Sequence, residues 1–368
     1  MDEVRLGIVG VKGIGQAHAW ASKQVPREML TAMCDVDAEL VARVAGGFGV
    51  AAFADAHEMF AAGVVDVVVI ATPPGTHVPL ARAALDAGLH VYCEKPIAPT
   101  ADEGYALADH ARSCARVLAV GFQFRFHKGF DAARRSVAGI GGIERVHVTA
   151  TNWFRPQEYY RRSPWRATWR MAGGGVLMNQ AIHQLDALVA IAGLPSRVRA
   201  RVSTALHDAE VEDDAYALLE WPSGARGVLI ASLDVPAGCE RLELYGSRGA
   251  VVVDDAFSVR AVAHDEVRAL SETCPDEYPA LDLDWHDVEV PRAPSEWLDM
   301  LVAAHRDFVD AVLDGREPQV GGVEGTRAVE LANAIYWSAL EDRTVELPLE
   351  RGAYTPVFEA LATGSASI

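Results

Sequence analysis

Two short stretches of the sequence carry the residue types that proton transfer needs. Residues 91–96 read as a short apolar strand that ends on Lys95 and is stopped by Pro96. A glycine run that begins at Gly173 leads into a helical pattern with Asn179, His183 and Asp186 at i, i+4 and i+7. This spacing places the three polar side chains on one helical face. A strand-end lysine and a histidine on a polar helix stripe form a plausible acid/base pair if the fold brings them together.

Each of these two residues also has a structural reading. Basic charge is carried almost wholly by arginine, and the only lysines are Lys12, Lys23, Lys95 and Lys128. Because lysine is scarce, its presence before Pro96 hints that an ammonium group is needed there. The alternative is a strand-end lysine in solvent. For His183 the alternative is a hydrogen-bonded histidine buried at a helix–sheet contact.

The N-terminal residues predict a Rossmann βαβ unit. Residues 4–9 have a buried-strand pattern, a glycine turn leads into a helix that runs to about residue 24, and residues 29–34 form a second strand. The turn allows a pyrophosphate to bind at the helix N-terminus, and an acidic residue after the second strand bonds the adenosine ribose. The residues expected to bind the dinucleotide are Gly10, Lys12, Gly13, Ile14, Gly15 and Asp35.

Lys12 stands where the middle glycine of this turn is expected. Either its side chain turns outward, adding charge near the phosphates, or cofactor binding is weakened or shifted. Asp35 would repel a 2′-phosphate, so NAD is favoured over NADP. The short basic reach of Lys12 keeps NADP from being excluded.

Strands and helices continue to alternate through the first third of the chain. Residues 64–70 form an apolar strand typical of a parallel sheet, followed by a loop at residues 71–77. Ligands bind at this edge of open α/β sheets. His77 begins the next helix and has both a structural and a catalytic reading. Residues 89–93 form the next strand and deliver Lys95 to the same edge. The fold class is therefore α/β, with a doubly wound parallel sheet.

The pattern changes after Gly121. Alternating, β-branched segments predict a large, mostly antiparallel sheet with helices on one face. Two amphipathic helices are expected at residues 296–313, with Ser295 as N-cap, and at residues 324–340. We therefore expect a Rossmann domain at residues 1–121 and an α+β domain for substrate binding and oligomerisation at residues 122–368. The exposed sheet face is the expected surface for a homodimer or homotetramer.

Aromatic and arginine residues are concentrated between residues 153 and 170, without helical or strand periodicity. Aromatic faces stack on sugar C–H surfaces, and arginines bond hydroxyls or a carboxylate, so the segment suits a carbohydrate site. At least one of Tyr160, Trp165 and Arg166 is expected to touch substrate. The alternative is that the aromatics anchor a long loop.

Composition limits the partners and the compartment. The net charge of −18 argues against nucleic acid and anionic membranes as partners. No apolar run is long enough to span a bilayer, and no export signal is visible, so a cytoplasmic protein is expected. The five cysteines are scattered and lack CxxC spacing, which predicts neither a disulfide framework nor a metal site.

Taken together, the motifs resemble those of the Gfo/Idh/MocA oxidoreductases, a family that includes glucose–fructose oxidoreductases and inositol dehydrogenases. The motifs are Gly-Ile-Val-Gly with Gly-Ile-Gly, Ala-Thr-Pro-Pro-Gly-Thr-His, Cys-Glu-Lys-Pro, Gly-Phe-Gln-Phe-Arg-Phe, and Gly-Gly-Gly-Val-Leu-Met-Asn-Gln-Ala-Ile-His-Gln-Leu-Asp. They run in family order, and the resemblance covers nearly the whole chain.

The resemblance implies a role for each matching residue. Lys95 would bond the reacting oxygen and stabilise its developing charge, and His183 would be the general acid/base. Glu94 would help to fix Lys95 near the ribose, and the Lys95–Pro96 bond would be cis. Thr72, Pro73 and His77 would line the path to the nicotinamide, and Arg125 would contact substrate. The implied enzyme is an NAD(P)-dependent dehydrogenase that acts on a CH–OH group of a sugar or polyol.

Asn179 departs from the inositol dehydrogenases of this family, which have aspartate four residues before the histidine. Asparagine can position a substrate but cannot raise the basicity of the histidine as a carboxylate does. Inositol specificity is therefore in doubt, and Asp186 is a candidate for the missing carboxylate.

Two other functions are open. One is an NAD-dependent glycosidase of the same family, in which the cofactor is reduced and reoxidised within one cycle. The other is a regulator that binds NAD and a sugar without turnover. The sequence does not identify the sugar, the oxidised carbon or the physiological direction.

Overall fold

The computed structural model describes residues 2–291 and 296–367, so the Ser295 cap expected for the first amphipathic helix lies outside the described residues. The chain divides into two compact units. The first unit comprises Met1–Phe126, Thr168–Gly173 and Ala293–Glu330, and the second comprises His127–Ala167, Gly174–Arg292 and Leu331–Ile368. The first unit thus adds two later segments to the residues expected for the Rossmann domain.

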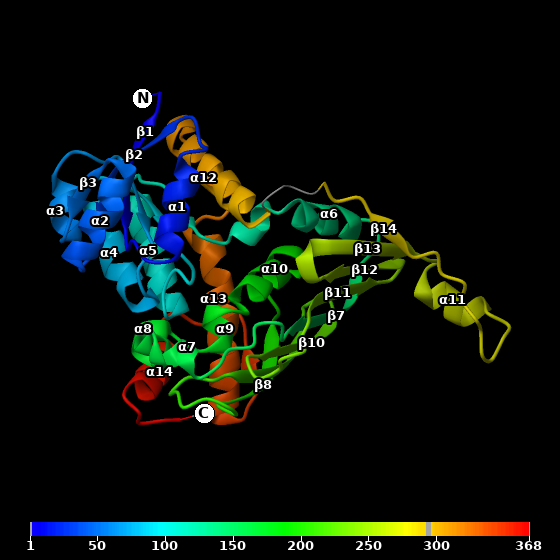
Figure 1. The fold of residues 1–368 in the computed structure, drawn as a ribbon. Coiled ribbons are helices and arrows are strands. Elements are labelled where there is room, and N and C mark those ends of the chain that lie inside the picture. The colour runs from blue at the N-terminus through cyan, green and yellow to red at the C-terminus, as the bar shows by residue number, and fades with distance from the viewer. Residues whose placement is uncertain (1, 292–295, 368) are drawn as a thin grey trace. The chain divides into compact units, whose positions relative to one another are not determined.

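A parallel sheet of six strands, in the order β3-β2-β1-β4-β5-β6, forms the centre of the first unit. The order reverses between β1 and β4, which is the switch point of a doubly wound sheet. Helices flank this sheet (Figure 1). The strands are β1 Val4–Val9, β2 Glu28–Cys34, β3 Ala51–Phe53, β4 Val67–Ile70, β5 His90–Cys93 and β6 Leu118–Val120.

The helices of the first unit connect these strands and come also from later parts of the chain. They are α1 Ile14–Ser22, α2 Ala38–Phe48, α3 Ala56–Ala61, α4 His77–Asp86, α5 Ala101–Ser113, α8 Trp169–Ala172 and α12 Glu296–Asp314, with the 3-10 turns η1 Pro74–Thr76 and η2 Gln123–Phe126. Helix α12 contributes Leu301, Phe308 and Val309 to the same core as Leu6 and Ile8 of β1. The Rossmann core is therefore completed by residues nearly 300 positions away.

The second unit is built on a sheet of nine strands, in the order β14-β13-β12-β11-β7-β10-β9-β8-β15. Only β7 and β10 pair in parallel, and the other neighbours are antiparallel. The strands are β7 Ile143–Ala150, β8 Arg197–Ser203, β9 Asp214–Glu220, β10 Arg226–Ser232, β11 Glu240–Gly246, β12 Gly249–Asp254, β13 Ser258–Ala263, β14 His286–Val288 and β15 Val345–Glu346. The mostly antiparallel sheet is confirmed.

Helices cover one face of this sheet, with α6 and α10 packed on it (Figure 1). On the other face, β9 exposes Tyr216 and Leu218, because the side chains of a strand alternate between faces. The helices are α6 Lys128–Val137, α7 Glu158–Arg161, α9 Val176–Asn179, α10 Ile182–Ala192, α11 Val267–Thr273 and α14 Thr355–Ala362, with η3 Pro164–Ala167 and η4 Asp255–Phe257. The boundary between the units falls within α13, Gly322–Glu341.

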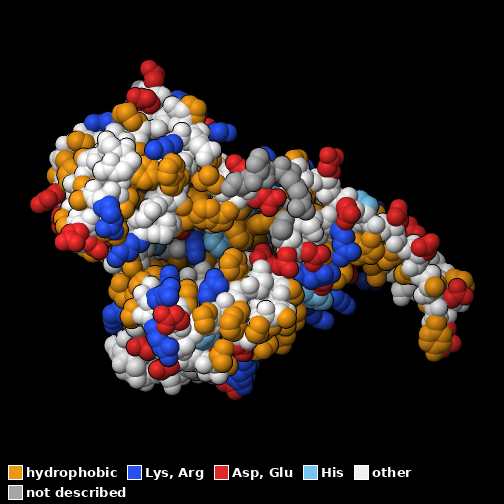
Figure 2. All heavy atoms as spheres, viewed as in Figure 1, with side chains coloured by type: hydrophobic (Ala, Val, Ile, Leu, Met, Phe, Trp, Pro, Cys, Tyr) orange, Lys and Arg blue, Asp and Glu red, His pale blue; other side chains and the backbone are white. Residues whose placement is uncertain are grey.

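The segment between β13 and β14 leaves the sheet and carries α11 (Figure 1). Several large apolar side chains there are exposed, among them Tyr278 at 85%. Orange atoms mark them along this part of the surface (Figure 2). Among the described residues, no helix combines the length and the apolar character that a membrane crossing requires.

Candidate functional site

The glycine turn between β1 and α1 has the geometry of a phosphate-binding turn. Gly10 has φ +90°, and a Cβ there would lie 2.6 Å from the carbonyl oxygen of Ala71. A Cβ on Gly15 would lie 1.8 Å from the carbonyl oxygen of Gly10. Helix α1 begins at Ile14, after Gly13, without a side-chain cap and without an acidic residue in its first turn. Its N–H groups are therefore not occupied by a protein carboxylate and suit an anion.

Asp35 and Lys12 lie beside this turn. The carboxylate of Asp35 accepts the N–H of Val11 at 3.0 Å and the N–H of Asp37 at 3.1 Å. These bonds fix Asp35 directly after β2, where an acidic residue reads the ribose in this fold. The Lys12 side chain is 73% exposed and its Nζ lies 3.9 Å from Asp37. The Lys12 side chain therefore points outward into solvent.

His77 links the loop after β4 to the loop that carries Lys95. Its Nε2 lies 2.7 Å from the carbonyl oxygen of Thr72, and its Nδ1 lies 2.8 Å from that of Pro96. Burial lowers the pKa of His77. The Thr72 hydroxyl accepts a hydrogen bond from Thr76 at 2.7 Å, and Pro73 precedes η1. The cis Lys95–Pro96 bond that the resemblance implies is confirmed. His77 thus joins two loops at one edge of the sheet.

Glu94 is buried between Lys95 and α1. One carboxylate oxygen lies 2.9 Å from Nε2 of His18, and the other accepts the backbone N–H of Lys95 at 3.2 Å. Burial by itself would raise the pKa of Glu94, but the bond from His18 and the charge of Lys95 outweigh it, so the pKa is lowered. Glu94 is therefore an ionised side chain next to Lys95.

Arg125 lies in η2, within the first unit, and is 8% exposed. Its backbone carbonyl accepts a hydrogen bond from Gln319 at 2.9 Å. Arg125 therefore belongs to the first unit, whereas the expected domain boundary at residue 121 put it in the second.

The expected single helix with Asn179, His183 and Asp186 on one face is wrong. The chain forms two helices, α9 and α10, with Gln180 and Ala181 between them. The N–H of Ala181 bonds the carbonyl of Val176, five residues back, at 2.8 Å. This turn is closed by an i→i−5 hydrogen bond and contains more residues than an α-helical turn, so the 3.6-residue periodicity is interrupted there. His183 and Asp186 remain together on α10, and Asn179 ends α9.

Tyr159 organises the predicted substrate residues of the second unit. Its hydroxyl accepts hydrogen bonds from the side-chain amides of Asn179 and Gln180, both at 2.9 Å. The Arg166 guanidinium lies 4.2 Å from the centre of the Tyr159 ring and 5.3 Å from that of Trp165. The structure thus brings together Asn179, Trp165 and Arg166 around a tyrosine that the sequence analysis did not select.

Tyr160, the neighbouring residue, is 3% exposed and packs against His207. Nδ1 of His207 lies 2.7 Å from Asp213, and its Nε2 lies 2.7 Å from the carbonyl oxygen of Arg155. Tyr160 and His207 therefore hold the aromatic segment in place from inside. This is the anchoring alternative for Tyr160, whereas Trp165 and Arg166 are partly exposed.

A buried carboxylate, Glu212, fixes the start of α9. It is 1% exposed and accepts the N–H of Gly175 at 2.7 Å, the N–H of Leu177 at 2.9 Å and the hydroxyl of Tyr336 at 2.8 Å. A Cβ on Gly175 would lie 1.7 Å from the carbonyl oxygen of Glu212. Burial raises the pKa of Glu212 to about 7. The sequence does not identify Glu212 as a buried residue, because it lies in the acidic segment 210–214 and acidic segments are usually exposed to solvent.

The candidate catalytic pair is divided between the units. Lys95 belongs to the first unit and His183, which is 7% exposed, to the second. Each unit assembles its own group of predicted residues: the glycine turn, Asp35, Glu94 and Lys95 in the first, and Asn179, His183, Asp186 and Arg166 in the second.

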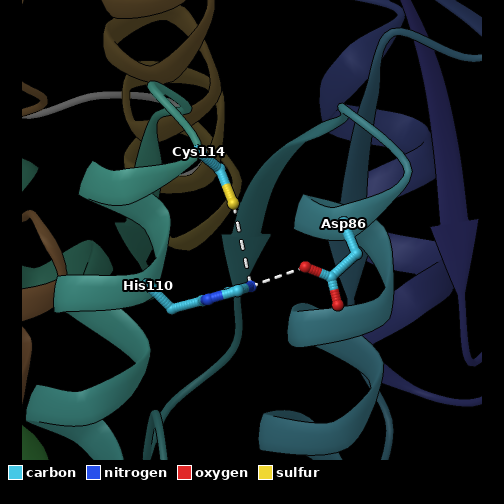
Figure 3. Close-up of side chains that lie close together, drawn as sticks. All are labelled: Asp86, His110 and Cys114. Carbon is cyan, nitrogen blue, oxygen red and sulfur yellow. Dashed lines mark hydrogen bonds and ion pairs between the residues drawn. The ribbon is translucent and has the colours of Figure 1, made fainter.

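Asp86, His110 and Cys114 form a further cluster on α4 and α5 (Figure 3). Nε2 of His110 lies 2.7 Å from Asp86 and 3.7 Å from Sγ of Cys114. Both contacts use the same ring nitrogen, so this is not a relay with carboxylate and thiol on opposite sides of the imidazole. The cluster ties the two helices together. Its signal in the sequence is the i, i+4 spacing of His110 and Cys114, which a search for CxxC misses.

Sequence comparison matches both halves of the chain to one family. Residues 4–122 match the oxidoreductase family with an NAD-binding Rossmann fold, Gfo/Idh/MocA. Residues 130–252 match the Gfo/Idh/MocA C-terminal domain. The two matches cover the glycine turn and Lys95 in one case, and Asn179, His183 and Glu212 in the other.

Individual relatives match this chain over nearly their whole length. An inositol 2-dehydrogenase from Rhizobium meliloti is 28% identical over 94% of this chain and 99% of the relative. A D-xylose 1-dehydrogenase (NADP(+)) from Haloferax volcanii is 29% identical over 93% of this chain and 99% of the relative. The crystal structure of the WlbA dehydrogenase from Bordetella pertussis, in complex with NADH and UDP-GlcNAcA, superimposes with a TM-score of 0.80 and 28% identity, covering 95% of this chain and 100% of that one.

The parallel sheet with its switch point, the open N-terminus of α1 and the two family matches agree with one another. The first unit is an NAD-binding Rossmann domain. This chain belongs to the Gfo/Idh/MocA oxidoreductase family.

Proposed function

We propose that this protein is an NAD(P)-dependent dehydrogenase that transfers a hydride between the nicotinamide and a hydroxyl or keto carbon of a sugar or sugar derivative. The observation that carries the proposal is the placement of Lys95. It follows β5 at the carboxyl edge of the sheet, in a loop joined through His77 to the loop after β4. The glycine turn lies at the end of β1, the parallel neighbour of β4.

The residues of the first unit fit a dinucleotide. The N–H groups at the start of α1 would receive the diphosphate, Gly10 and Gly15 allow the backbone to approach closely, and Asp35 would bond the ribose hydroxyls. Thr72, Pro73 and Glu94 would line the way to Lys95. The bound nicotinamide supplies the hydride acceptor or donor. Asp35 favours NAD, and the exposed ammonium of Lys12 leaves NADP as a second cofactor.

The chain's own residues carry the proton chemistry. His183 would take the proton from the reacting hydroxyl, since an imidazole exchanges protons near neutral pH. Lys95 would stabilise the charge that develops on that oxygen. Asn179, oriented by its bond to Tyr159, would position the substrate, and Asp186, one turn after His183, is the carboxylate available on the same helix.

The substrate class follows from the second unit and from the relatives. Trp165 and Arg166 around Tyr159 offer an aromatic face and guanidinium donors, which suit a sugar ring with hydroxyl or carboxylate groups. The relatives named above act on inositol and D-xylose, and the WlbA structure contains a nucleotide-linked sugar acid. Substrates should therefore be sought among polyols, pentoses and sugar acids.

We further propose that the protein is a homodimer or homotetramer formed through the exposed face of the large sheet. Tyr216 is 50% and Leu218 is 59% exposed on that face. Replacement of Leu218 by glutamate should lower the molar mass measured by analytical ultracentrifugation. An unchanged mass would assign the contact to another surface.

The test of the activity is absorbance at 340 nm with NAD and then NADP across inositols, aldoses, sugar acids and simple glycosides. Lys95→Ala and His183→Ala should each lower the rate by about 100-fold or more. Lys23→Ala, a lysine at the end of α1, is the matched control and should leave the rate unchanged. Release of a leaving group from glycosides without net NADH would favour the glycosidase, and binding without turnover would favour the regulator.

A further inference from the structure

Four buried titratable side chains form a continuous row inside the first unit. Glu28 begins β2, His305 lies in α12, His18 lies in α1, and Glu94 follows β5. The His305 Nδ1 lies 2.8 Å from Glu28, the His305 Nε2 lies 2.8 Å from Nδ1 of His18, and the His18 Nε2 lies 2.9 Å from Glu94. Both imidazoles are 0% exposed, and Glu28 and Glu94 are 7% and 6% exposed. The row ends beside Lys95.

Counting protons shows that this row cannot consist of two carboxylates and two neutral imidazoles. Each of the three contacts needs one proton between its two heavy atoms, and each neutral imidazole carries only one. Two neutral rings therefore supply two protons for three contacts. The third proton must be on a carboxyl group or must make one ring an imidazolium. A contact without a proton would place two buried lone pairs against each other, which is costly.

The surroundings of Glu94 indicate where the third proton lies. Glu94 also accepts the N–H of Lys95, which favours its ionised form. Burial lowers the pKa of His18, which favours a neutral ring. A neutral His18 that donates from Nε2 to Glu94 must accept at Nδ1 from Nε2 of His305. The third proton then lies in the contact between His305 and Glu28.

Other groups face the row from the elements packed around it. The Tyr92 ring of β5 stacks on His305 at 5.6 Å and meets His18 edge-on at 5.3 Å. Burial raises the pKa of Tyr92 well above its usual value, so it stays neutral. Further groups that act electrostatically on Glu94 or Tyr92 include Lys95, His77, Cys93 and Asp307.

We propose that Glu28, His305, His18 and Glu94 form one proton-sharing row that keeps Glu94 ionised beside Lys95, with the third proton in the contact between His305 and Glu28. Glu28, His305 and His18 are thereby positioning residues, which act on Lys95 through Glu94. The catalytic meaning of Lys95 rests on the proposed function, whereas the proton arrangement does not. The row is tested on the protein without cofactor or substrate.

The first experiment is nitrogen-15 NMR of the histidine rings between pH 5.5 and 8.5, with His18 and His305 assigned through His18→Gln and His305→Gln. His18 should be a neutral ring protonated at Nε2 over the whole range. A His18 ring protonated at Nδ1, or one that gains a proton with a midpoint inside the range, would overturn the proposal.

The second experiment reads Lys95 directly. With four lysines in the chain, reductive methylation with carbon-13 formaldehyde gives few signals, and Lys95→Arg identifies the one of interest. His18→Phe removes the donor to Glu94 and should raise the pH at which Glu94 gains a proton. The signal of the neighbouring Lys95 should then show a titration step at acidic pH that lies higher than in the wild type. His18→Gln, which keeps an N–H donor, should restore part of the shift.

Glu28→Gln tests whether the row depends on the proton between Glu28 and His305 or on the negative charge of Glu28. Its amide can donate to Nδ1 of His305, so this contact still contains a proton and the acidic step in the Lys95 signal should stay where it is in the wild type. His110→Phe, at a histidine–carboxylate contact outside the row (Figure 3), is the matched control. Equal shifts for Glu28→Gln and His18→Phe would overturn the placement of the proton. If the NMR results agree with the proposed proton arrangement but no sugar is oxidised, the proposed dehydrogenase activity is wrong and the proton arrangement still holds.

Discussion

The glycine turns before α1 and α9 differ in what occupies the helix N-terminus. The turn before α1 has no side-chain cap, and Lys12 and Gly13 are exposed. At the turn before α9, the carboxylate of Glu212 accepts the N–H groups of Gly175 and Leu177. A helix N-terminus attracts an anion in both cases. The first turn has no side-chain cap, and the second is closed by the protein's own carboxylate.

The comparison teaches that a glycine turn before a helix is not by itself a ligand site. What decides is whether an acidic side chain from elsewhere reaches the free N–H groups. Glu212 lies more than 30 residues after the turn that it closes, so no local pattern reveals it. At the first turn the nearby acid, Asp35, is instead bound to Val11 and Asp37 and leaves α1 open.

The largest effect is expected from opening the closed turn. Glu212→Ala would leave the donors of Gly175, Leu177 and Tyr336 buried without their acceptor, and we expect a loss of about 4 kcal/mol in the free energy of unfolding. Urea denaturation followed by circular dichroism measures it. Glu346→Ala, on the exposed end of β15, is the control and should change stability by less than about 0.5 kcal/mol. A small loss for Glu212→Ala would mean that water replaces the carboxylate.

Blocking the turn before α1 should weaken cofactor binding strongly. Gly15→Ala places a Cβ 1.8 Å from the carbonyl oxygen of Gly10, which must move the turn. We expect NAD affinity, measured by calorimetry, to fall by about 100-fold or more, or about 3 kcal/mol. Gly46→Ala is the matched control, because a Cβ at this position in the last turn of α2 meets nothing within 4 Å. NAD binding that survives Gly15→Ala would place the diphosphate elsewhere.

The closed turn should also make stability depend on pH. Burial raises the pKa of Glu212 from 4.5 to about 7, so the folded state favours the protonated form. This contribution is fully present below pH 4.5 and is lost as the pH rises through 7, by up to about 3 kcal/mol. Urea midpoints from pH 5 to 8.5 for the wild type and Glu212→Gln should diverge in this window. Parallel curves would contradict the assignment.

The smallest effect concerns the charge at the rim of the open turn. Lys12→Ala removes an exposed ammonium that is 3.9 Å from Asp37. Exposed charges contribute about 1 kcal/mol or less, so NADP affinity should fall by a few-fold relative to NAD. Calorimetry with both nucleotides measures the ratio, with Lys23→Ala as control. An unchanged ratio would show that Lys12 does not reach a 2′-phosphate.

The elements with regular periodicity were predictable from the sequence. The two amphipathic helices predicted at residues 296–313 and 324–340 are observed at Glu296–Asp314 and Gly322–Glu341, because long helices repeat the apolar spacing several times. The parallel sheet and the mostly antiparallel sheet were both expected. Several elements were not predicted, among them the helices α3, α6, α7 and α14 and the strands β13 and β14. Most of them are short, and a short element contains few repeats of the helical or strand periodicity.

The site was predictable where it depends on local motifs and not where it depends on distant contacts. Lys95 was predicted from a short motif, and its cis peptide bond was implied by the family resemblance. The break between α9 and α10, the role of Tyr159 and the partner of Glu28 do not. His305 lies 277 residues from Glu28, and such pairings arise only when the chain is folded.

The contribution of α12 to the first unit has a consequence for how these proteins can recombine. A gene exchange that replaces only the first 126 residues would bring a foreign β1 and α1 against the native α12, with its Leu301, Phe308 and His305. The residues that form the dinucleotide-binding unit are therefore not contiguous in the gene. A chimera made from two relatives should fold best when residues 296–330 come from the same parent as the N-terminus.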